Sequence, residues 1–358
     1  MRIKKALFLG TLCTAVSGMS LFAQAGVSYA KSAEKTTEAA SSEEAESEEE
    51  TSEEVTYPIT IEHAFGETVI ESKPERIATI GWENQDTPLA LGVAPVGVSA
   101  ANYGMVTDNN LHPWTDEAFA DLGVEKPVVF DDVDGLDFEQ ISDCNPDVIL
   151  AAYSGMTQED YDTLSQIAPA IPYKEKAWQT SWREQTIENA EGMGMKPEGE
   201  KKVKEVEDLI AEKLEEYPQL EGIPTAFCWI SADDFSTFYV YLPTDPRAAY
   251  LLDLGFTLPE SVQKLAGETD DFNITVSREN ADQLDDIQLM VVYGDEDLLK
   301  SLQEDKLMSQ IPAIKNGAVA LVDSTSALAG ACTPSILSIP YEIDEYLQLL
   351  SDAAENIK

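Results

Sequence analysis

Short hydrophobic runs alternate with amphipathic segments through most of the chain after residue 57. The runs are rich in β-branched and aromatic residues and predict buried strands: Arg76–Ile80, Val96–Ser99, Val128–Phe130, Val148–Ala152, Thr225–Ile230, Phe238–Tyr241, Leu289–Tyr293 and Ala318–Val322. Apolar residues spaced three and four positions apart predict helices at Asp160–Ile167, Asp245–Leu254, Asp297–Ile311 and Pro340–Ala354. This alternation predicts an α/β fold class in which helices cover central parallel sheets.

One longer helical segment interrupts this rhythm near the middle of the folded region. It covers Glu198–Glu216, follows Pro197 and ends before Pro218. A single apolar stripe runs along it, formed by Val203, Val206, Ile210 and Leu214. We therefore predict an N-terminal lobe over residues 57–196, a connecting helix over 197–218 and a C-terminal lobe over 219–358.

A weak internal repeat supports two similar lobes. Glu139-Gln140-Ile141 precedes a strand that leads to Tyr153, and Glu279-Asn280-Ala281 precedes a strand that leads to Tyr293. The offset is constant, so each lobe has a glutamate, a short helix, a strand and a tyrosine in the same order.

The composition of the first 56 residues predicts a targeting segment and a linker rather than part of the α/β fold. Arg2, Lys4 and Lys5 precede an apolar run with small residues beyond it, which predicts a signal peptide over residues 1–30; a retained membrane anchor is the alternative. Cys13 follows Leu12 rather than a small residue, which argues against a lipid anchor there. Residues 31–56 contain ten Glu, two Lys and no aromatic residue, so we expect a disordered acidic linker.

Composition narrows the possible functions. The chain of 358 residues has 67 acidic and 23 basic side chains and a net charge of −44, which disfavours nucleic acid as a partner. With two histidines and no P-loop, dinucleotide-binding or nucleophile-elbow motif, we expect a binding protein and not an enzyme. Cys144, Cys228 and Cys332 lie in or near apolar stretches, so we expect inert core thiols.

Several motifs resemble one known family. They are Thr60–Gly66, Pro74–Ala78, Ala90–Val98 and Asn145–Leu150, together with Trp82-Glu83-Asn84, Ala152–Glu159 and Asp245-Pro246-Arg247. In this order they resemble the ferric-siderophore-binding proteins of ABC importers, which are class III periplasmic binding proteins. The resemblance implies two Rossmann-like lobes with central parallel sheets, joined by one long rigid helix. It also implies an exported, monomeric receptor in the cell envelope, which delivers its ligand to a permease driven by a cytoplasmic ATPase.

A ferric siderophore is already coordinatively saturated, so its receptor needs aromatic walls and cationic donors rather than metal ligands or a cofactor. Arg183 and Arg247 follow aromatic residues, and other aromatic or polar residues follow predicted strands, where α/β lobes bind ligands. The predicted ligand-binding residues are Trp82, Asn84, Tyr103, Tyr153, Ser154, Trp178, Trp182, Arg183, Trp229, Tyr239, Tyr241 and Arg247. The alternative is core packing for the aromatic residues and surface ion pairs for the arginines.

By resemblance, Glu139 and Glu279 are expected to dock into arginine pockets of the permease, one from each lobe. The scarcity of basic residues slightly favours a neutral or weakly anionic chelate, such as a hydroxamate, over a tris-catecholate. Two alternatives stay open: the same fold binding a corrinoid or haem, and a cell-surface interaction protein that uses its acidic face.

Overall fold

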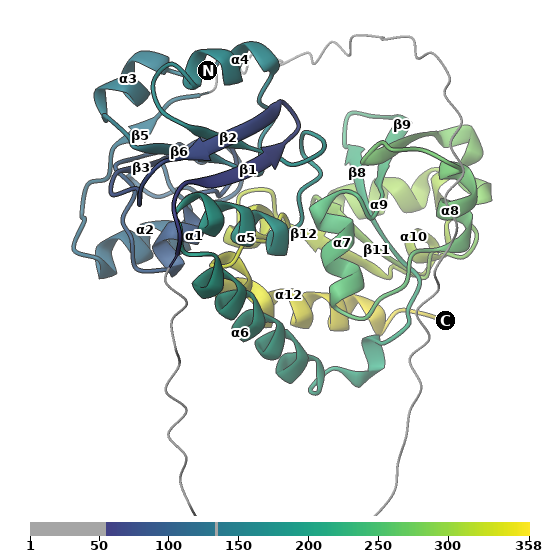
Figure 1. Ribbon diagram of the computed structural model, residues 1–358. Coiled ribbons are helices and arrows are strands. Elements are labelled where there is room, and N and C mark those ends of the chain that lie inside the picture. Colours follow the sequence, from purple (N-terminus) through teal and green to yellow (C-terminus); the bar gives the residue numbers. More distant parts are fainter. Residues whose placement is uncertain (1–54, 133–134) are drawn as a thin grey trace, which may run out of the picture. The chain divides into compact units, whose positions relative to one another are not determined.

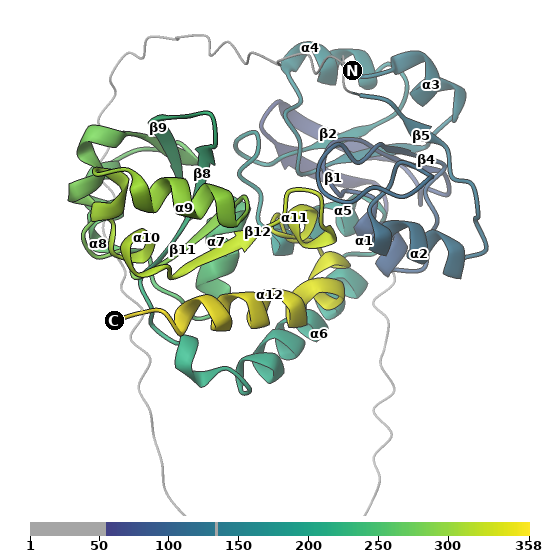
Figure 2. The same ribbon diagram turned by 180° about the vertical axis from the view of Figure 1, so that it is seen from behind.

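The computed structural model describes residues 55–132 and 135–358, which form two α/β lobes (Figures 1 and 2). The predicted signal peptide, Cys13 and nearly all of the predicted linker lie outside the described residues. Within the described part of the chain, no helix combines the length and the apolar character that crossing a membrane requires.

The N-terminal lobe contains a sheet of five parallel strands. Its strands are β3 (Ile77–Thr79), β4 (Gly97–Ser99), β5 (Val129–Phe130), β6 (Val148–Ala151) and β7 (Ala170–Pro172), in the order β5-β4-β3-β6-β7. Its helices are α1 (Asp86–Ala90), α2 (Pro113–Asp121), α3 (Phe138–Asp143), α4 (Gln158–Leu164) and α5 (Trp182–Gly192). An antiparallel hairpin of β1 (Ile59–His63) and β2 (Gly66–Ile70) precedes them. Every residue of β6 is buried, as expected for a parallel strand covered on both faces.

The helix α6 (Lys196–Leu214) leads from this lobe to the next, in the region where a connecting helix was predicted over 197–218. Pro197 lies in its first turn, where a missing backbone N–H costs nothing. Its stripe of Val203, Val206 and Ile210 is buried in the core of the C-terminal lobe. A short 3-10 helix, η1 (Pro218–Leu220), follows it.

The C-terminal lobe has a mixed sheet in the order β10-β9-β8-β11-β12. The strands β8 (Thr225–Ser231), β11 (Leu289–Tyr293) and β12 (Val319–Val322) are parallel, whereas β9 (Asp234–Tyr241) and β10 (Asn273–Ser277) are antiparallel to their neighbours. The α/β prediction is confirmed, but the antiparallel edge was not predicted. It arises because a tight turn joins β8 to β9, and such a turn permits only an antiparallel pair.

The helical elements of this lobe are α7 (Pro246–Asp253), α8 (Glu260–Ala266), η2 (Arg278–Gln283), α9 (Glu296–Glu304), η3 (Met308–Gln310), α10 (Pro312–Asn316), α11 (Ala327–Ala331) and α12 (Ser338–Ala354). The single helix predicted over Asp297–Ile311 is therefore wrong. Asp305 has an extended backbone and accepts hydrogen bonds from the backbone N–H groups of Leu307 and Met308, which ends α9 and starts η3.

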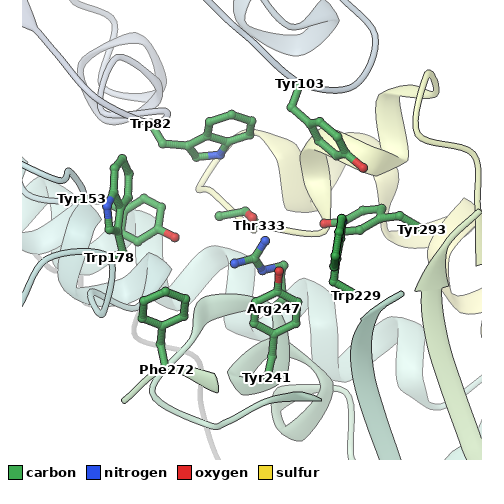
Figure 3. A pocket seen from close by; sticks show the side chains of 10 residues that line it. All are labelled: Trp82, Tyr103, Tyr153, Trp178, Trp229, Tyr241, Arg247, Phe272, Tyr293 and Thr333. Carbon is green, nitrogen blue, oxygen red and sulfur yellow. The ribbon is translucent and has the colours of Figure 1, made fainter. Parts of the chain in front are cut away.

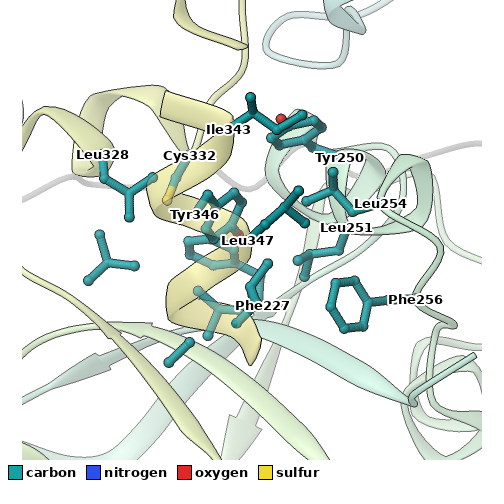
Figure 4. Packing of buried hydrophobic residues seen from close by; sticks show 14 of the residues in the cluster. Phe227, Tyr250, Leu251, Leu254, Phe256, Leu328, Cys332, Ile343, Tyr346 and Leu347 are labelled. Atoms are coloured by element: carbon teal, nitrogen blue, oxygen red, sulfur yellow. The ribbon is translucent and has the colours of Figure 1, made fainter. Parts of the chain in front are cut away.

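One hydrophobic core of the C-terminal lobe lies between the sheet and the helices α7 and α12 (Figure 4), and a second contains residues of α8, α9 and α10. Ile343, Tyr346 and Leu347 of α12 pack with residues of α7 and with Phe227 of β8. Cys332 belongs to this core, and Cys144 and Cys228 are also buried and free, as predicted. Burial raises the pKa of the Cys332 thiol to about 12, which keeps it protonated and unreactive at neutral pH.

The internal repeat has a structural counterpart. The strands β6 and β11 hold the same place in the order of their sheets, and each follows a short helix that carries a glutamate in its first turn. Glu139 of α3 and Glu279 of η2 are both exposed.

Candidate ligand-binding site

A cavity of about 350 Å³ is lined by side chains from both lobes (Figure 3). Eight of its ten lining residues are aromatic: Trp82, Tyr103, Tyr153, Trp178, Trp229, Tyr241, Phe272 and Tyr293, accompanied by Arg247 and Thr333. This volume lies within the range of about 300–1,000 Å³ that is usual for small-molecule sites.

The parallel strands bring these walls together at their carboxyl ends. Trp82 and Tyr153 follow β3 and β6, which are neighbours in the sheet, and the backbone N–H of Trp82 donates to the Tyr153 carbonyl at 3.2 Å. In the other lobe, Trp229 belongs to β8 and Tyr293 ends its neighbour β11. Ligands in open α/β sheets bind at this edge, so the placement agrees with the expected site.

Asn84 holds the Trp82 and Tyr153 segments together instead of lining the cavity. Its side-chain amide donates to the carbonyls of Ile80 (2.7 Å) and Tyr153 (2.9 Å), and its Oδ1 accepts from the Tyr153 N–H at 3.1 Å. The side chain is fully buried. Ser154 is also internal, because its hydroxyl donates to the Ala151 carbonyl at 2.8 Å.

Gly81 permits this close approach of the two segments. Its φ is +82°, and an added Cβ would lie 2.8 Å from both the Ser154 Cβ and the Tyr153 carbonyl oxygen. Gly155 has a similar role under Trp178, since a Cβ there would lie 2.6 Å from the indole. The glycines therefore fix where these two tryptophan-bearing segments can lie.

Arg247 is the one charged residue among the described residues that line the cavity. Its Nε and Nη2 donate to the two carboxylate oxygens of Asp245 at 2.8 and 2.7 Å, and its Cζ lies 3.9 Å from the centre of the Tyr241 ring. Burial opposes the charge, but the Asp245 carboxylate outweighs it and holds the Arg247 pKa well above its ordinary value. The guanidinium is thus charged and already neutralised by a buried acid.

The tyrosine hydroxyls of the cavity are neutral. Burial raises the pKa of Tyr103 to about 12 and raises those of Tyr153, Tyr241 and Tyr293 as well. Figure 3 shows the hydroxyl of Tyr153 and the guanidinium of Arg247 directed toward the middle of the cavity. Such groups offer hydrogen bonds, whereas phenolate ligation of a bare metal would first require an unfavourable deprotonation. Among the described residues, no cluster of three or more His, Cys, Asp or Glu could hold a metal ion.

The mouth of the cavity carries large exposed rings. Tyr103, Trp178 and Trp229 are 36%, 39% and 41% exposed. Trp178 packs edge-on against the buried Tyr153, with ring centres 5.3 Å apart. A bulky apolar ligand would cover these rings and remove their surface from water.

Seven of the twelve predicted ligand-binding residues line the cavity, and the other five lie elsewhere. Besides Asn84 and Ser154, these are Trp182, Arg183 and Tyr239. Trp182 is buried and donates to Asp253 at 3.0 Å, and Arg183 forms ion pairs with Glu207 (2.6 Å) and Asp253 (2.7 Å). Arg183 belongs to the first turn of α5, which aims it at α6 and α7.

Three lining residues were not predicted. Tyr293 had a usable signal, because it is the repeat counterpart of Tyr153, which also lines the cavity. Phe272 and Thr333 lie outside regular elements and outside any recognisable motif, so the sequence pattern carries no signal for them.

Comparison with known proteins gives three results. Residues 77–325 match the model of a protein family described as periplasmic binding protein. The structure of PiaA from Streptococcus pneumoniae TIGR4 in complex with ferrichrome is 48% identical, covers 84% of this chain and 100% of that chain, and superposes with a TM-score of 0.81. The petrobactin-binding protein YclQ of Bacillus subtilis (strain 168) is 24% identical over 305 residues, which are 81% of this chain and 88% of that protein.

Proposed function

Because the chain belongs to the periplasmic binding protein family, we propose that it is an extracytoplasmic receptor that binds a ferric siderophore in the aromatic cavity and delivers it to the permease of an ABC importer. The observation that carries this proposal is the cavity itself, with eight aromatic walls and one neutralised guanidinium. Family membership also confirms the prediction of a substrate-binding protein rather than an enzyme.

The ligand is a neutral ferric trihydroxamate of the ferrichrome class. Three hydroxamate anions cancel the charge of Fe³⁺, and the Arg247–Asp245 pair makes the cavity nearly neutral as well. A ferric tris-catecholate carries three negative charges, which would be removed from water without a free cation among the described residues that line the cavity. The relation to PiaA, whose structure contains ferrichrome, supports the same class of ligand.

Each part of the cavity has a role in this binding. The indole and phenol faces pack against the apolar surface of the chelate, while Arg247 and the neutral tyrosine hydroxyls donate hydrogen bonds to its oxygen atoms. The protein supplies no ligand to the iron, which stays in its chelate throughout.

Delivery requires contact with a membrane partner. The exposed glutamates Glu139 and Glu279 lie at equivalent places in the two lobes and are suited to pairing with arginines of a two-fold permease. The connecting helix α6 shares a buried core with the C-terminal lobe, so only a small rocking motion accompanies binding.

Tryptophan fluorescence of the purified protein tests the ligand assignment, because Trp82, Trp178 and Trp229 line the cavity. The titrants are ferric ferrichrome, a ferric tris-catecholate, a ferric carboxylate chelate, cyanocobalamin and haem. Saturable quenching by ferrichrome at submicromolar concentration is the expected result. A response to cyanocobalamin or haem alone would replace the ligand but keep the importer role, and silence from all five would favour an interaction protein.

A further inference from the structure

A buried hydrogen bond joins the two lobes next to the cavity. The Ser335 hydroxyl donates to Oδ2 of Asp86 at 2.5 Å, although the two residues are 249 positions apart in the sequence. Asp86 starts α1 of the N-terminal lobe and Ser335 precedes α12 of the C-terminal lobe. Their exposed fractions are 0% and 1%, so water does not compete for this bond.

Ser335 also organises the start of α12. Its Oγ accepts from the backbone N–H of Ser338 at 2.9 Å, and the Ser338 hydroxyl accepts from the Ser335 N–H at 2.7 Å. This reciprocal pair substitutes for a cap at the formal N-cap residue Leu337, whose side chain makes no capping bond. The single hydroxyl proton of Ser335 is left for Asp86, so the bond connects Asp86 to the first turn of α12.

The Asp86 carboxylate also accepts two hydrogen bonds from its own lobe. It accepts from Nε1 of Trp114 at 2.9 Å and from Oγ1 of Thr115 at 2.8 Å, both on α2. A buried carboxylate needs all of its donors, because each one lost leaves part of the charge uncompensated. The Ser335 donor comes from the other lobe and is therefore the one that a relative movement of the lobes would remove.

The bond lies between two walls of the cavity. Trp82 is four residues before Asp86, and Thr333 is two residues before Ser335. Within the N-terminal lobe, the His112 ring lies 5.3 Å from the Trp82 ring and stacks on Trp114 at 4.5 Å. Gly330 of α11 packs against this imidazole so closely that an added Cβ would lie 2.6 Å from its Cε1.

We propose that Asp86 and Ser335 are positioning residues for ligand binding. Their buried hydrogen bond fixes the position of the cavity-lining residue Trp82 relative to the cavity-lining residue Thr333 before the ligand binds. This inference rests on the proposed function of the cavity. Without the bond, the two lobes of the free protein adopt several relative positions. Part of the binding free energy is then used to restore the relative position that binds the ligand.

Ser335→Ala removes the donor to Asp86 and also the Oγ that accepts from the Ser338 N–H, whereas the Ser338 hydroxyl still accepts from the backbone N–H of residue 335. Stopped-flow tryptophan fluorescence with ferric ferrichrome should show roughly tenfold weaker binding, most of it from faster dissociation. Ser335→Thr keeps the hydroxyl and should restore affinity to within about threefold of the wild type.

Ser261→Ala is the matched control. The Ser261 hydroxyl also donates to a carboxylate, that of Asp286, but both residues belong to the C-terminal lobe and neither lines the cavity. Ser261→Ala should lower the thermal midpoint by an amount similar to Ser335→Ala and leave the ferrichrome affinity unchanged. Loss of stability with unchanged affinity in Ser335→Ala would overturn the proposal.

A measurement without ligand separates this inference from the proposed function. Cysteines introduced at the exposed positions Ser142 and Lys300, one in each lobe, accept spin labels, while the three native thiols of the described chain are buried. Double electron–electron resonance should give a broader distance distribution in Ser335→Ala than in the wild type or Ser261→Ala. Identical distributions would overturn the inference, even if no siderophore bound; failure of the wild type to bind any chelate would overturn the proposed function alone.

Discussion

Asp245 and Arg247 form a bidentate ion pair in the wall of the cavity, with N–O distances of 2.8 and 2.7 Å and an Asp245 side chain that is only 1% exposed. The carboxylate also accepts from the Arg247 backbone N–H and so caps α7. The pair therefore places a hydrogen-bond donor at the cavity while cancelling its charge.

Asp245→Asn should shift the selectivity of the cavity toward anionic chelates. Asparagine preserves the helix cap but not the negative charge, so Arg247 would face the ligand as an uncompensated cation. We expect the ratio of affinities for a trianionic ferric tris-catecholate and for neutral ferric ferrichrome to rise about tenfold in fluorescence titrations. Asp253→Asn, next to Arg183 and outside the cavity, is the control. An unchanged ratio in Asp245→Asn would contradict this account of selectivity.

The sequence patterns predicted the fold well, because strand and helix periodicities reflect burial that is local to each segment. Most walls of the cavity were also predictable, since they follow strands whose ends meet at one edge of a sheet. The sequence patterns could not distinguish a residue that lines the cavity from one that holds a lining residue in place. Trp82 lines the cavity and Asn84 holds it from behind, although both belong to the same short motif.

Arginines were the hardest residues to assign. Arg183 and Arg247 both follow aromatic residues in the sequence, yet the first is paired with carboxylates of α6 and α7 and only the second lines the cavity. The difference depends on where distant carboxylates lie after folding, which a local pattern does not contain. Ser335 and Asp86 show the same limit, because their contact depends on the packing of one lobe against the other.

Alanine substitutions of Trp229 and Tyr239 should differ in their effect on ligand binding, although both residues are aromatic and similarly exposed. They are cross-strand partners on β8 and β9 with exposed fractions of 41% and 39%, but only Trp229 lines the cavity. Trp229→Ala should weaken ferric ferrichrome binding by tenfold or more, because a large apolar contact is lost, and Tyr239→Ala by less than about threefold. Isothermal titration calorimetry measures both without depending on the fluorescence of Trp229. Equal losses would place the ligand over both rings.

Asp86 should make the stability of the protein depend on pH. Burial raises its pKa from an ordinary 3.8 to about 6, against the hydrogen bonds from Ser335, Thr115 and Trp114, which lower it. The folded protein thus holds this proton more tightly than the unfolded chain does. The resulting stabilisation is fully present below pH 3.8 and is lost as the pH rises through about 6.

Asp86→Asn cannot titrate, so its free energy of unfolding relative to the wild type should increase between pH 4 and 7 by about 3 kcal/mol. The Asp86 carboxylate also raises the pKa of the buried Glu83, so its removal lowers the Glu83 pKa and acts in the same direction. Urea denaturation at several pH values measures this difference. Asp323→Asn is a control of opposite sign, because hydrogen bonds from Thr325 lower the pKa of Asp323 and its stabilising effect is lost as the pH falls. A relative stability of Asp86→Asn that does not change with pH would show that this carboxyl has no raised pKa.

The exposed glutamates Glu139 and Glu279 should matter for transport and not for binding. Each lies in the first turn of a short helix before the equivalent strands β6 and β11, and neither lines the cavity. The double substitution Glu139→Ala with Glu279→Ala should abolish uptake of radiolabelled ferric ferrichrome by cells that carry the cognate importer, while the purified variant keeps its affinity. Glu159→Ala with Glu296→Ala removes one exposed acid from the first turn of a helix in each lobe and is the matched control. If the first pair reduced uptake no more than the control pair, the prediction would be wrong and the permease would recognise another part of the two lobes. The double substitution Glu139→Asp with Glu279→Asp keeps the negative charges and shows whether the loss of charge causes the effect.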